Sequence, residues 1–486
     1  MTGLSKRCET IALALIVLAA LVLRWRAFAP YDISHADEIM QYLEQGKRLA
    51  TGAGIVPWEY RFGARNSLIP QLLAGPFWLG RQLAPDSLAG MLLARGAFLG
   101  AGLLALPAAW KLGALSGRAQ ALAALFVAAV WYECVLFSTL MLSEVLASGL
   151  LALAAALLLA DSPTRGALRW AGLLLGLGVI VRLQYAPFAA VLVLARLRLD
   201  RALWAQLLLG GIAAGAIGGF SDLIAGQVPF RWIWINFAYN MGEDRAARFG
   251  ESGPLQYMQW LLLHLGPVAP FILAGAIFSP PRYRPLVWAL VANLLFHSVI
   301  AHKEYRFTWI STWSVLVLAA IASVELAQRL AARRGRELTL AMLGALGLVW
   351  LGASFAAQAQ SGGARSLRGG SPIPLAALAA VEQSRPCGIA LPDQWRAHLV
   401  PALLPREVSL YIAPEAVMAR GEALPPGVIA SADVLVFPAR PKGAEAFREL
   451  ACRDNGTVKA CAYLRPGKCT ADPHWSYQAA LEREGL

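Results

Sequence analysis

The sequence is poor in charged residues and in cysteine. Only 15% of its 486 residues are charged and 58% are hydrophobic, whereas a soluble domain averages about 25% charged and about 45–50% apolar residues. This composition excludes a soluble enzyme, a disordered chain and a DNA-binding protein. The six cysteines are too few for a disulfide scaffold in a chain of this length. The chain also lacks a P-loop, a glycine-rich dinucleotide fingerprint and any His/Cys/Asp spacing typical of a metal site, so we expect neither a cofactor nor a metal.

Long apolar runs are abundant instead. Stretches of about 20 residues, the length that a bilayer span requires, recur through the first three quarters of the chain. The basic residues behind the net charge of +13 lie in short clusters between these runs. This is the positive-inside pattern of a multispanning membrane protein, and we expect no nucleic-acid partner. We therefore predict an all-α polytopic membrane protein with about eleven transmembrane helices. The predicted spans lie near residues 9–29, 88–110, 118–136, 143–160, 168–183, 186–198, 202–222, 256–280, 285–302, 305–327 and 337–358.

Two apolar segments have a second interpretation. The first run is also compatible with a signal peptide, because Ala27-Phe28-Ala29 resembles a cleavage site. In either case the chain from residue 30 onward lies on the outer side. Residues 68–84 contain two prolines and an arginine, so we predict an interfacial segment there rather than a span.

Three segments are predicted to lie outside the membrane: a first outer loop at 30–87, a second at 223–255, and the C-terminal residues 361–486. We accordingly divide the chain into a transmembrane catalytic domain (1–360) and a small extracytoplasmic α/β domain (361–486). This last part follows a Gly/Ser-rich hinge near 361–371 and contains the strand-like run 434–437. The Ala/Leu/Arg-rich composition is typical of a bacterial protein. We therefore expect the protein to lie in the inner membrane, with these three segments in the periplasm.

Four of the six cysteines lie in the C-terminal part, where an oxidising compartment favours one or two disulfides. Either Cys469 or Cys452 is a candidate partner for Cys461.

The first outer loop offers a candidate catalytic base. It opens with His35-Ala36-Asp37-Glu38, and an acceptor hydroxyl needs a carboxylate within hydrogen-bond reach to take its proton. The alternative is that His35, Asp37 and Glu38 only cap and charge the N-terminus of a helix, where acids are favourable. Further polar and aromatic residues follow in the same loop, namely Trp58, Glu59 and Arg65.

A cationic segment stands between the predicted spans nine and ten. His302, Lys303 and Arg306 crowd the outer end of a hairpin with almost no loop, and Glu304 lies among them. Such residues can clamp a phosphate, because arginine offers paired donors and lysine a compact charge. The alternative is that they only reach toward lipid headgroups.

Other candidates lie at the ends of spans, where polar residues at membrane depth are costly. Arg182 lies within an apolar run without an acid beside it, and Glu144 and Asp222 lie at span ends. In the second loop, Asn236 lies among aromatic residues that either form an interfacial belt or stack on a sugar.

The order of these motifs resembles glycosyltransferase family 22, the mannosyltransferases of the GT-C superfamily that use dolichyl-phosphate-mannose in N-glycan precursor and GPI-anchor assembly. The similar motifs are His35-Ala36-Asp37-Glu38, Gly52-Ala53-Gly54, Trp58-Glu59, Arg65-Asn66-Ser67, Asp222, Asn236-Phe237, Phe249-Gly250, Pro254–Tyr257 and the intact segment His302–Phe307. Ala36 and Pro57 depart from the family pattern, which has proline and threonine there.

The resemblance implies a GT-C fold and an inverting, metal-independent transfer of a sugar, mannose above all, from a polyprenyl- or dolichyl-phosphate donor to a lipid-linked glycan acceptor. Asp37 would act as the base, with Glu38 beside it. His302, Lys303 and Arg306, together with Arg182, would hold the donor phosphate. Residues His35, Trp58, Glu59, Arg65, Glu144, Asp222 and Asn236 would contact substrates.

Two other functions stay open from the sequence. One is a polytopic transporter or flippase of a polar lipid, whose sites typically lie near the midplane in repeated halves. The other is a GT-C transferase for another sugar or for protein acceptors.

Overall fold

The computed structural model describes residues 6–31, 33, 35–197, 200–243, 247, 250–362 and 372–486. Phe249 and most of the predicted hinge, residues 363–371, lie outside this part of the chain. The chain forms two compact units. The first, the helical unit, comprises Met1–Phe28 and Phe98–Leu367, and the second, the mixed unit, comprises Ala29–Ala97 and Arg368–Leu486.

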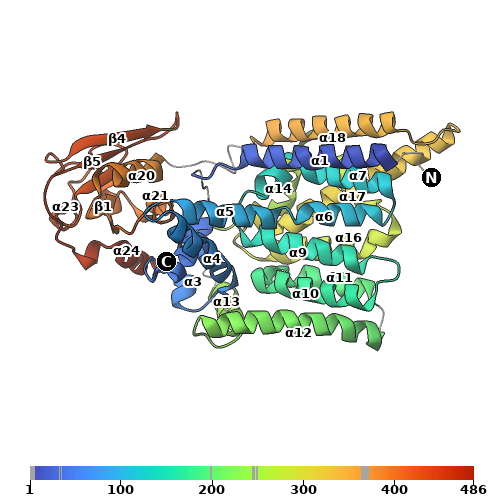
Figure 1. The fold of residues 1–486 in the computed structure, drawn as a ribbon, viewed down its shortest axis with the longest axis horizontal. Helices are drawn as coiled ribbons and strands as arrows, with labels where there is room; N and C mark the ends of the chain where they lie inside the picture. Colours follow the sequence, from blue (N-terminus) through green and yellow to red (C-terminus); the bar gives the residue numbers. More distant parts are fainter. Residues whose placement is uncertain are drawn as a thin grey trace. The chain divides into compact units, whose positions relative to one another are not determined.

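The helical unit consists of long apolar helices that lie side by side (Figure 1). Its α-helices are α1 (Lys6–Ala27), α5 (Ala89–Gly102, which begins in the mixed unit), α6 (Ala105–Ala114), α7 (Arg118–Val130), α8 (Tyr132–Phe137), α9 (Ser143–Leu158), α10 (Arg165–Val181), α11 (Ala186–Arg196), α12 (Arg201–Ile224), α13 (Arg231–Phe237), α14 (Gln256–Leu265), α15 (Ala269–Ile277), α16 (Arg284–Val299), α17 (Trp309–Arg333) and α18 (Leu340–Ser361). Shorter turns are η2 (Leu183–Tyr185), η3 (Ala238–Gly242), η5 (Gly266–Val268), η6 (Pro281–Tyr283) and η7 (Tyr305–Thr308).

Small residues allow these helices to approach closely, as is common in membrane proteins. A Cβ atom added to Gly172 of α10 would lie 1.9 Å from the carbonyl oxygen of Leu207 in α12. A Cβ at Gly210 of α12 would likewise lie 1.9 Å from the carbonyl oxygen of Arg169. The contact between α10 and α12 therefore depends on glycine from both sides.

The chain is an integral membrane protein by the length and composition of its helices. Within the described residues, 6 helices are long and apolar enough to cross a bilayer: Lys6–Ala27, Ala89–Ala114, Arg201–Ile224, Gln256–Ile277, Tyr305–Arg333 and Leu340–Ser361. Arg118–Val130, Ser143–Leu158 and Leu183–Arg196 are apolar but shorter. A helix of 16 residues such as α9 is about 24 Å long, less than the hydrocarbon thickness of about 30 Å. Helices thus occur at the predicted spans, while the number eleven stays a prediction.

The mixed unit joins the first outer loop to the C-terminal part. From the loop come the π-helix η1 (Glu38–Leu43), α2 (Glu44–Thr51), α3 (Trp58–Arg61) and α4 (Leu68–Leu83). The C-terminal part adds α20 (Pro372–Ser384), β1 (Gly388–Leu391), α21 (Gln394–Ala397), η8 (Pro401–Leu403), β2 (Ser409–Ile412), α22 (Glu415–Ala419), α23 (Pro426–Ser431), β3 (Val434–Phe437), β4 (Arg448–Asp454), β5 (Lys459–Leu464), η9 (Pro473–Trp475) and α24 (Tyr477–Glu484).

The strands form one sheet in the order β2-β1-β3-β5-β4, which confirms the predicted small C-terminal α/β part and its strand at 434–437. Strands β2, β1 and β3 are parallel, and β5 and β4 continue the sheet antiparallel. Val434 and Val436 contribute to one hydrophobic core, and Leu435 and Phe437 to the other, as the two-residue period of a strand requires. Helix α20 packs on the sheet (Figure 1).

The first outer loop shares one of these cores. Met40 of η1 and Ile55 lie in the same cluster as Ile389 of β1 and Val434 of β3. Polar contacts run the same way, because the Gln478 side chain accepts from the Val56 N–H at 2.9 Å and donates to the Val56 carbonyl at 3.2 Å. The loop and the C-terminal part therefore fold as one body.

Two disulfides are present, Cys387–Cys469 and Cys452–Cys461. The candidate pairing of Cys461 with Cys452 is confirmed, and that with Cys469 is wrong. Cys452 lies opposite Cys461 in the β4–β5 ladder, so the antiparallel register brings these two side chains together.

Candidate active site

The cationic segment of the helical unit lies where α16 gives way to α17. After α16 ends at Val299, Ile300 and Glu304 adopt extended backbone conformations. The turn η7 follows at once and leads into α17. This abrupt reversal holds the side chains from 302 to 306 at one end of two apolar helices.

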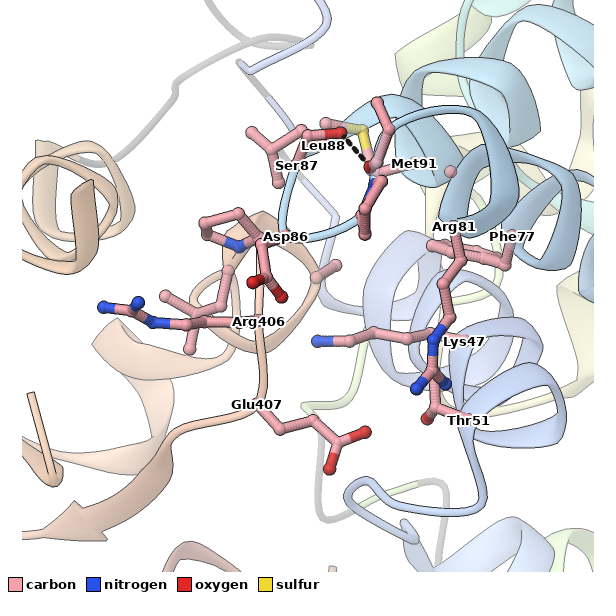
Figure 2. A pocket seen from close by; sticks show the side chains of 16 residues that line it. Lys47, Thr51, Phe77, Arg81, Asp86, Ser87, Leu88, Met91, Arg406 and Glu407 are labelled. Atoms are coloured by element: carbon pink, nitrogen blue, oxygen red, sulfur yellow. Dashed lines mark hydrogen bonds between the residues drawn. The ribbon is translucent and has the colours of Figure 1, made fainter. Parts of the chain in front are cut away.

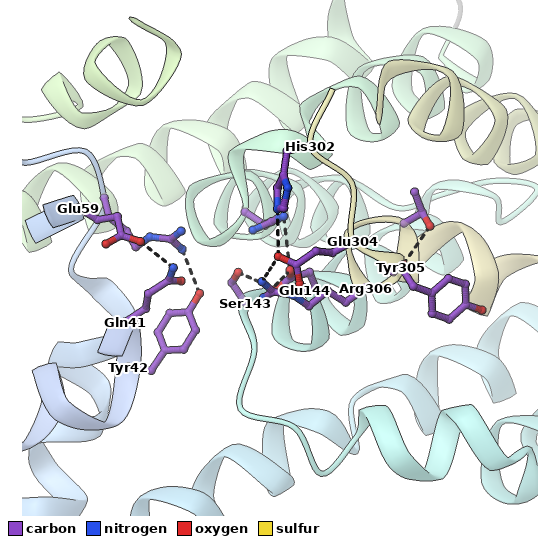
Figure 3. Close-up of polar contacts among 12 residues, drawn as sticks. Gln41, Tyr42, Glu59, Ser143, Glu144, His302, Glu304, Tyr305 and Arg306 are labelled. Carbon is purple, nitrogen blue, oxygen red and sulfur yellow. Dashed lines mark hydrogen bonds and ion pairs between the residues drawn. The ribbon is translucent and has the colours of Figure 1, made fainter. Parts of the chain in front are cut away.

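Arg306 is the centre of a buried ion cluster (Figure 3). Its Nε and Nη2 donate to the two carboxylate oxygens of Glu304 at 2.7 and 2.9 Å. Its Nη1 lies 3.2 Å from Oε1 of Glu144. The same Glu144 oxygen is 3.4 Å from Nη2 of Arg182. We call Arg182, Glu144 and Arg306 the Arg–Glu–Arg cluster.

The local backbone explains why these three residues meet. Glu144 lies in the first turn of α9, and Arg182 is the extended residue that ends α10. The ring of Phe307 lies 4.7 Å from the guanidinium of Arg182 and 5.1 Å from that of Arg306, a favourable cation–π arrangement. Arg182 has no acid beside it in the sequence, and the structure supplies one in the buried Glu144.

Charge and exposure indicate what the cluster can bind. Glu144 is fully buried, and the side chains of both arginines are 7% exposed, whereas that of Glu304 is 33% exposed. The two acids balance the two arginines, and Glu304 is the acid that solvent reaches most easily. An anion with paired oxygens could replace the Glu304 carboxylate on the Arg306 guanidinium, because that fork matches carboxylate and phosphate alike.

His302 and Lys303 lie beside this cluster but differ in their contacts. The His302 ring nitrogens lie 3.3 Å from Oε1 of Glu304 and 3.0 Å from the Gly250 carbonyl oxygen. The hydrogen bond to Glu304 raises the pKa of His302 above its usual value. The Lys303 ammonium donates instead to the carbonyl oxygens of Ser252, at 3.0 Å, and Ile300. Lys303 therefore ties the second loop to this turn, and its contact with a phosphate stays a prediction.

A second buried network, which the sequence did not reveal, anchors the same turn. Oε1 of Glu133 accepts a hydrogen bond from the Tyr305 hydroxyl at 2.7 Å, and Oε2 accepts one from the Trp131 indole at 3.1 Å. The His264 ring stacks on Tyr305 with centroids 4.0 Å apart, and its Nδ1 lies 3.3 Å from the Tyr132 hydroxyl. Glu133 is a lone acid in an apolar run, and in the sequence only this feature indicates that its side chain has a buried partner.

Asp222 and Asn236 lie elsewhere in the helical unit. The buried Asp222 carboxylate accepts hydrogen bonds from the Phe230 N–H at 2.8 Å and the Trp232 indole at 3.1 Å. Asp222 thus supports the entry into α13, on which Asn236 is half-buried. Contact of these two residues with a substrate stays a prediction.

The acidic segment belongs to the mixed unit. Asp37 is half-buried just before η1, and Glu38 is buried as the first residue of η1. The Gln41 amide donates to Glu59 at 2.8 Å, and Arg65 donates to the Tyr42 hydroxyl at 3.1 Å (Figure 3).

The charges in this segment influence one another. Burial raises the pKa of Glu59, the Arg65 guanidinium opposes this rise, and Asp37 adds to it. The structure therefore gathers Asp37, Glu59 and Arg65 within electrostatic range. His35 and Trp58 are half-buried in the same loop.

The Gly-x-Gly motif builds the turn between these residues. Gly52 ends α2 in a left-handed conformation, with φ of 82°. A Cβ on Gly54 would lie 2.8 Å from Oε1 of Glu44, the oxygen that accepts from the Ile55 N–H at 3.0 Å. These glycines therefore allow the backbone conformation of the turn, because a side chain would be strained at Gly52 and would clash at Gly54.

Comparisons with known proteins identify the fold. ArnT from Cupriavidus metallidurans bound to undecaprenyl phosphate is similar with a TM-score of 0.57 at 14% identity, over 95% of this chain and 99% of that chain. A second similar structure is the archaeal oligosaccharyltransferase AglB from Archaeoglobus fulgidus in complex with an inhibitory peptide and a dolichol-phosphate. Its TM-score is 0.50 at 14% identity, over 83% of this chain and 64% of that chain. A search of curated proteins gives no match. The solved structures thus support a GT-C fold.

The sequence also matches a family model, that of the Alg9-like mannosyltransferases, over residues 15–367. This range covers most of the chain. It contains the acidic segment, the Arg–Glu–Arg cluster and the cationic segment at residues 302–306. The protein is therefore a membrane glycosyltransferase that belongs to the Alg9-like mannosyltransferase family.

Proposed function

We propose that the protein transfers a mannosyl residue from a polyprenyl-phosphate donor to a lipid-linked glycan acceptor, with inversion at the anomeric carbon. The reaction would take place at the periplasmic face of a bacterial inner membrane. The observation that carries this proposal is the pair of buried arginines that share Glu144 at the end of apolar helices. Such a pair is costly at membrane depth and marks a functional site by default.

The donor phosphate would bind at the cationic turn. It would replace the exposed Glu304 carboxylate on Arg306, with protonated His302 and Arg182 as further positive groups. When the bond between the anomeric carbon and the phosphate oxygen breaks, negative charge develops on the phosphate. Fixed cations in a water-poor site stabilise that charge strongly.

The acceptor would be activated by the acidic segment. Asp37 would take the proton of the acceptor hydroxyl as its oxygen attacks the anomeric carbon, with Glu38 beside it. His35, Trp58, Glu59 and Arg65 would contact the substrates around it. Asp37 and Arg65 both influence the pKa of Glu59 through their charges. This electrostatic interaction among the three side chains supports the assignment.

The solved relatives support the chemical class of the donor. ArnT was solved with undecaprenyl phosphate and AglB with a dolichol-phosphate. Both ligands are long isoprenoid chains that carry a phosphate. A polyprenyl-phosphate sugar agrees with a cationic cluster at the ends of apolar helices.

Donor binding tests this proposal directly. Binding of radiolabelled mannosyl polyprenyl phosphate to the protein in nanodiscs should weaken at least about tenfold in Arg306→Ala, because loss of a charged hydrogen-bond partner costs about 1.5–3 kcal/mol. Arg282→Ala is the matched control, since Arg282 forms an exposed ion pair with Asp161 at 2.9 Å, a type of contact that contributes little. Equal donor affinity in both variants would refute the phosphate site.

A second candidate is a GT-C transferase for another sugar. The likeness to ArnT over 95% of this chain favours it, because that fold is shared while the sugar is set by local contacts. A panel of polyprenyl-phosphate sugars in the same binding assay separates the two candidates. Movement of the lipid across the membrane without any glycan product would instead favour the flippase alternative.

A further inference from the structure

The mixed unit contains a pocket apart from the acidic segment (Figure 2). It has a volume of about 430 Å³, within the range of small-molecule sites. Helix α2 contributes Lys47 and Thr51, and α4 contributes Phe77 and Arg81. The turn after α4 and the segment around residues 402–407 complete the lining.

The charged groups of this pocket have both signs. Lys47 and Arg81 line it together with Asp86 and Glu407, and we call these four residues the mixed-charge pocket. Figure 2 shows the charged ends of Lys47, Asp86 and Glu407 directed into the space between the segments. Arg406 also lines the pocket, but its guanidinium points away and donates to the Val381 carbonyl at 2.8 Å.

These opposite charges do not neutralise one another. In the part of the chain that the structure describes, the side chains of Arg81, Asp86 and Glu407 make no hydrogen bond or ion pair. Lys47 donates one hydrogen bond, to the Pro401 carbonyl at 3.1 Å, so two of its three protons stay available. The four groups are therefore held around a space rather than against each other.

This arrangement favours a neutral polyhydroxyl ligand. A phosphate would meet Asp86 and Glu407, and a cation would meet Lys47 and Arg81, so each would face like charges. A sugar hydroxyl donates one hydrogen bond and accepts others, so it can satisfy carboxylates and cations alike. Phe77 and Met91 add apolar surface for the C–H faces of a sugar ring.

We propose that the mixed-charge pocket binds the sugar residues of the acceptor glycan. This inference rests on the proposed function, because it assigns the acceptor to a second place in the same compact unit as Asp37. Asp86 and Glu407 accept hydrogen bonds from sugar hydroxyls, and Lys47 and Arg81 donate to them. The pocket thus recognises the glycan of the acceptor and does not bind its lipid phosphate.

The test is sugar binding by the full chain in nanodiscs. Binding is measured by saturation-transfer NMR with α-1,2-mannobiose as the probe. The wild type should give a signal that inorganic phosphate does not displace. The double variant Asp86→Asn/Glu407→Gln should bind the disaccharide about tenfold more weakly. Asparagine is chosen because Asp86 has a φ of 55°, which asparagine tolerates. Glu382→Gln is the control, since Glu382 is an exposed acid outside the pocket.

Other outcomes separate this inference from the proposed function. Asp37→Asn should keep the NMR signal while it loses transfer. Absence of a signal, an equal signal in the double variant, or displacement by phosphate overturns the pocket assignment even if mannosyl transfer is observed. Sugar binding without any mannosyl transfer overturns the proposed function and leaves the pocket as a glycan site.

Discussion

At the scale of single residues, the proposed function depends on charges that are expensive to bury. Arg182 and Arg306 are held by one carboxylate, Glu144, and the exposed Glu304 covers the remaining face of Arg306. Because removal of one partner leaves a buried charge unpaired, each residue of this cluster matters for folding as well as for the proposed donor binding. The donor-binding test of Arg306→Ala should therefore be accompanied by Arg306→Gln, a variant that keeps more of the size and polarity of the side chain.

The first prediction concerns the proposed base. Asp37→Asn should lower the transfer rate by about 10²–10⁴-fold, the usual contribution of general base catalysis, since an amide cannot take the proton of the acceptor hydroxyl. Binding of the labelled donor should change little. Rates are measured as labelled glycan formed by the protein in nanodiscs. A variant with near wild-type turnover would remove Asp37 from this role.

The second prediction concerns pH. The pKa of His302 is raised by its hydrogen bond to Glu304, so the ring carries a proton below that pKa and loses it as the pH rises through it. The apparent KM for the donor should therefore increase about fivefold toward alkaline pH, the factor that a partly exposed charge of about 1 kcal/mol gives. In His302→Asn this increase should vanish. Parallel KM profiles in the two proteins would show that His302 does not meet the phosphate.

The sequence revealed the charged candidates better than it revealed their partners. Arg182, Glu144 and Arg306 stood out because charges at the ends of apolar runs are rare. The carbonyl partners of Lys303 and the N–H partner of Asp222 depend on backbone positions that no side-chain pattern encodes. Glu133 was overlooked for a related reason, because its partner Tyr305 lies 172 residues away in the sequence.

At the scale of helices and strands, the turn η7 is fixed from two sides. Arg306 is held by the Arg–Glu–Arg cluster, and its neighbour Tyr305 is held by Glu133 of α8 and by the His264 ring. A short turn with two anchors keeps the Arg306 guanidinium in a defined position for the proposed donor. Such preorganisation reduces the cost of binding.

The third prediction tests this anchor. Tyr305→Phe removes the hydroxyl that donates to Glu133 and leaves a buried carboxylate oxygen without it, which should destabilise the protein by about 1–3 kcal/mol. The donor KM should rise with it. Thermal unfolding and donor titration measure the two effects. Tyr31→Phe, at an exposed position, is the control, and equal behaviour of the two variants would show that η7 needs no such anchor.

The fourth prediction concerns the disulfides. Cys387 and Cys469 are 82 residues apart, and Cys452 and Cys461 are 9 apart. Chain-entropy arguments give about 4.5 and about 2.6 kcal/mol for loops of these lengths. Replacing the first pair by alanine should therefore lower the unfolding temperature more than replacing the second. The reverse order in a thermal melt would contradict this ranking.

At this scale the sequence predicted the helices well and their lengths less well. Hydropathy located each apolar run, but helices such as α9 are shorter than the bilayer core is thick. Breaks at Trp131 and at Gly266, the latter with φ of 67°, divide two further runs. Such breaks depend on tertiary packing, so composition alone could not give the number of crossings.

At the scale of the whole molecule, the structure joins parts that are distant in the sequence. Residues 29–97 and 368–486 form one compact unit with a shared core. The charge pattern predicted that both lie on the outer side, but it carries no information about which outer segments pack together. Met40 and Ile55 of the first outer loop pack against strands that lie more than 300 residues later in the sequence.

The most direct test of the proposed function is transfer by the full chain in nanodiscs. Mannosyl polyprenyl phosphate and GDP-mannose, each labelled in the mannose, are supplied in parallel with a lipid-linked glycan acceptor, and the labelled product is identified by mass. The proposed function predicts labelled glycan from the polyprenyl-phosphate donor, none from GDP-mannose, and loss of product in Asp37→Asn. Label transferred from GDP-mannose alone, or no labelled glycan from any polyprenyl-phosphate sugar, would contradict it.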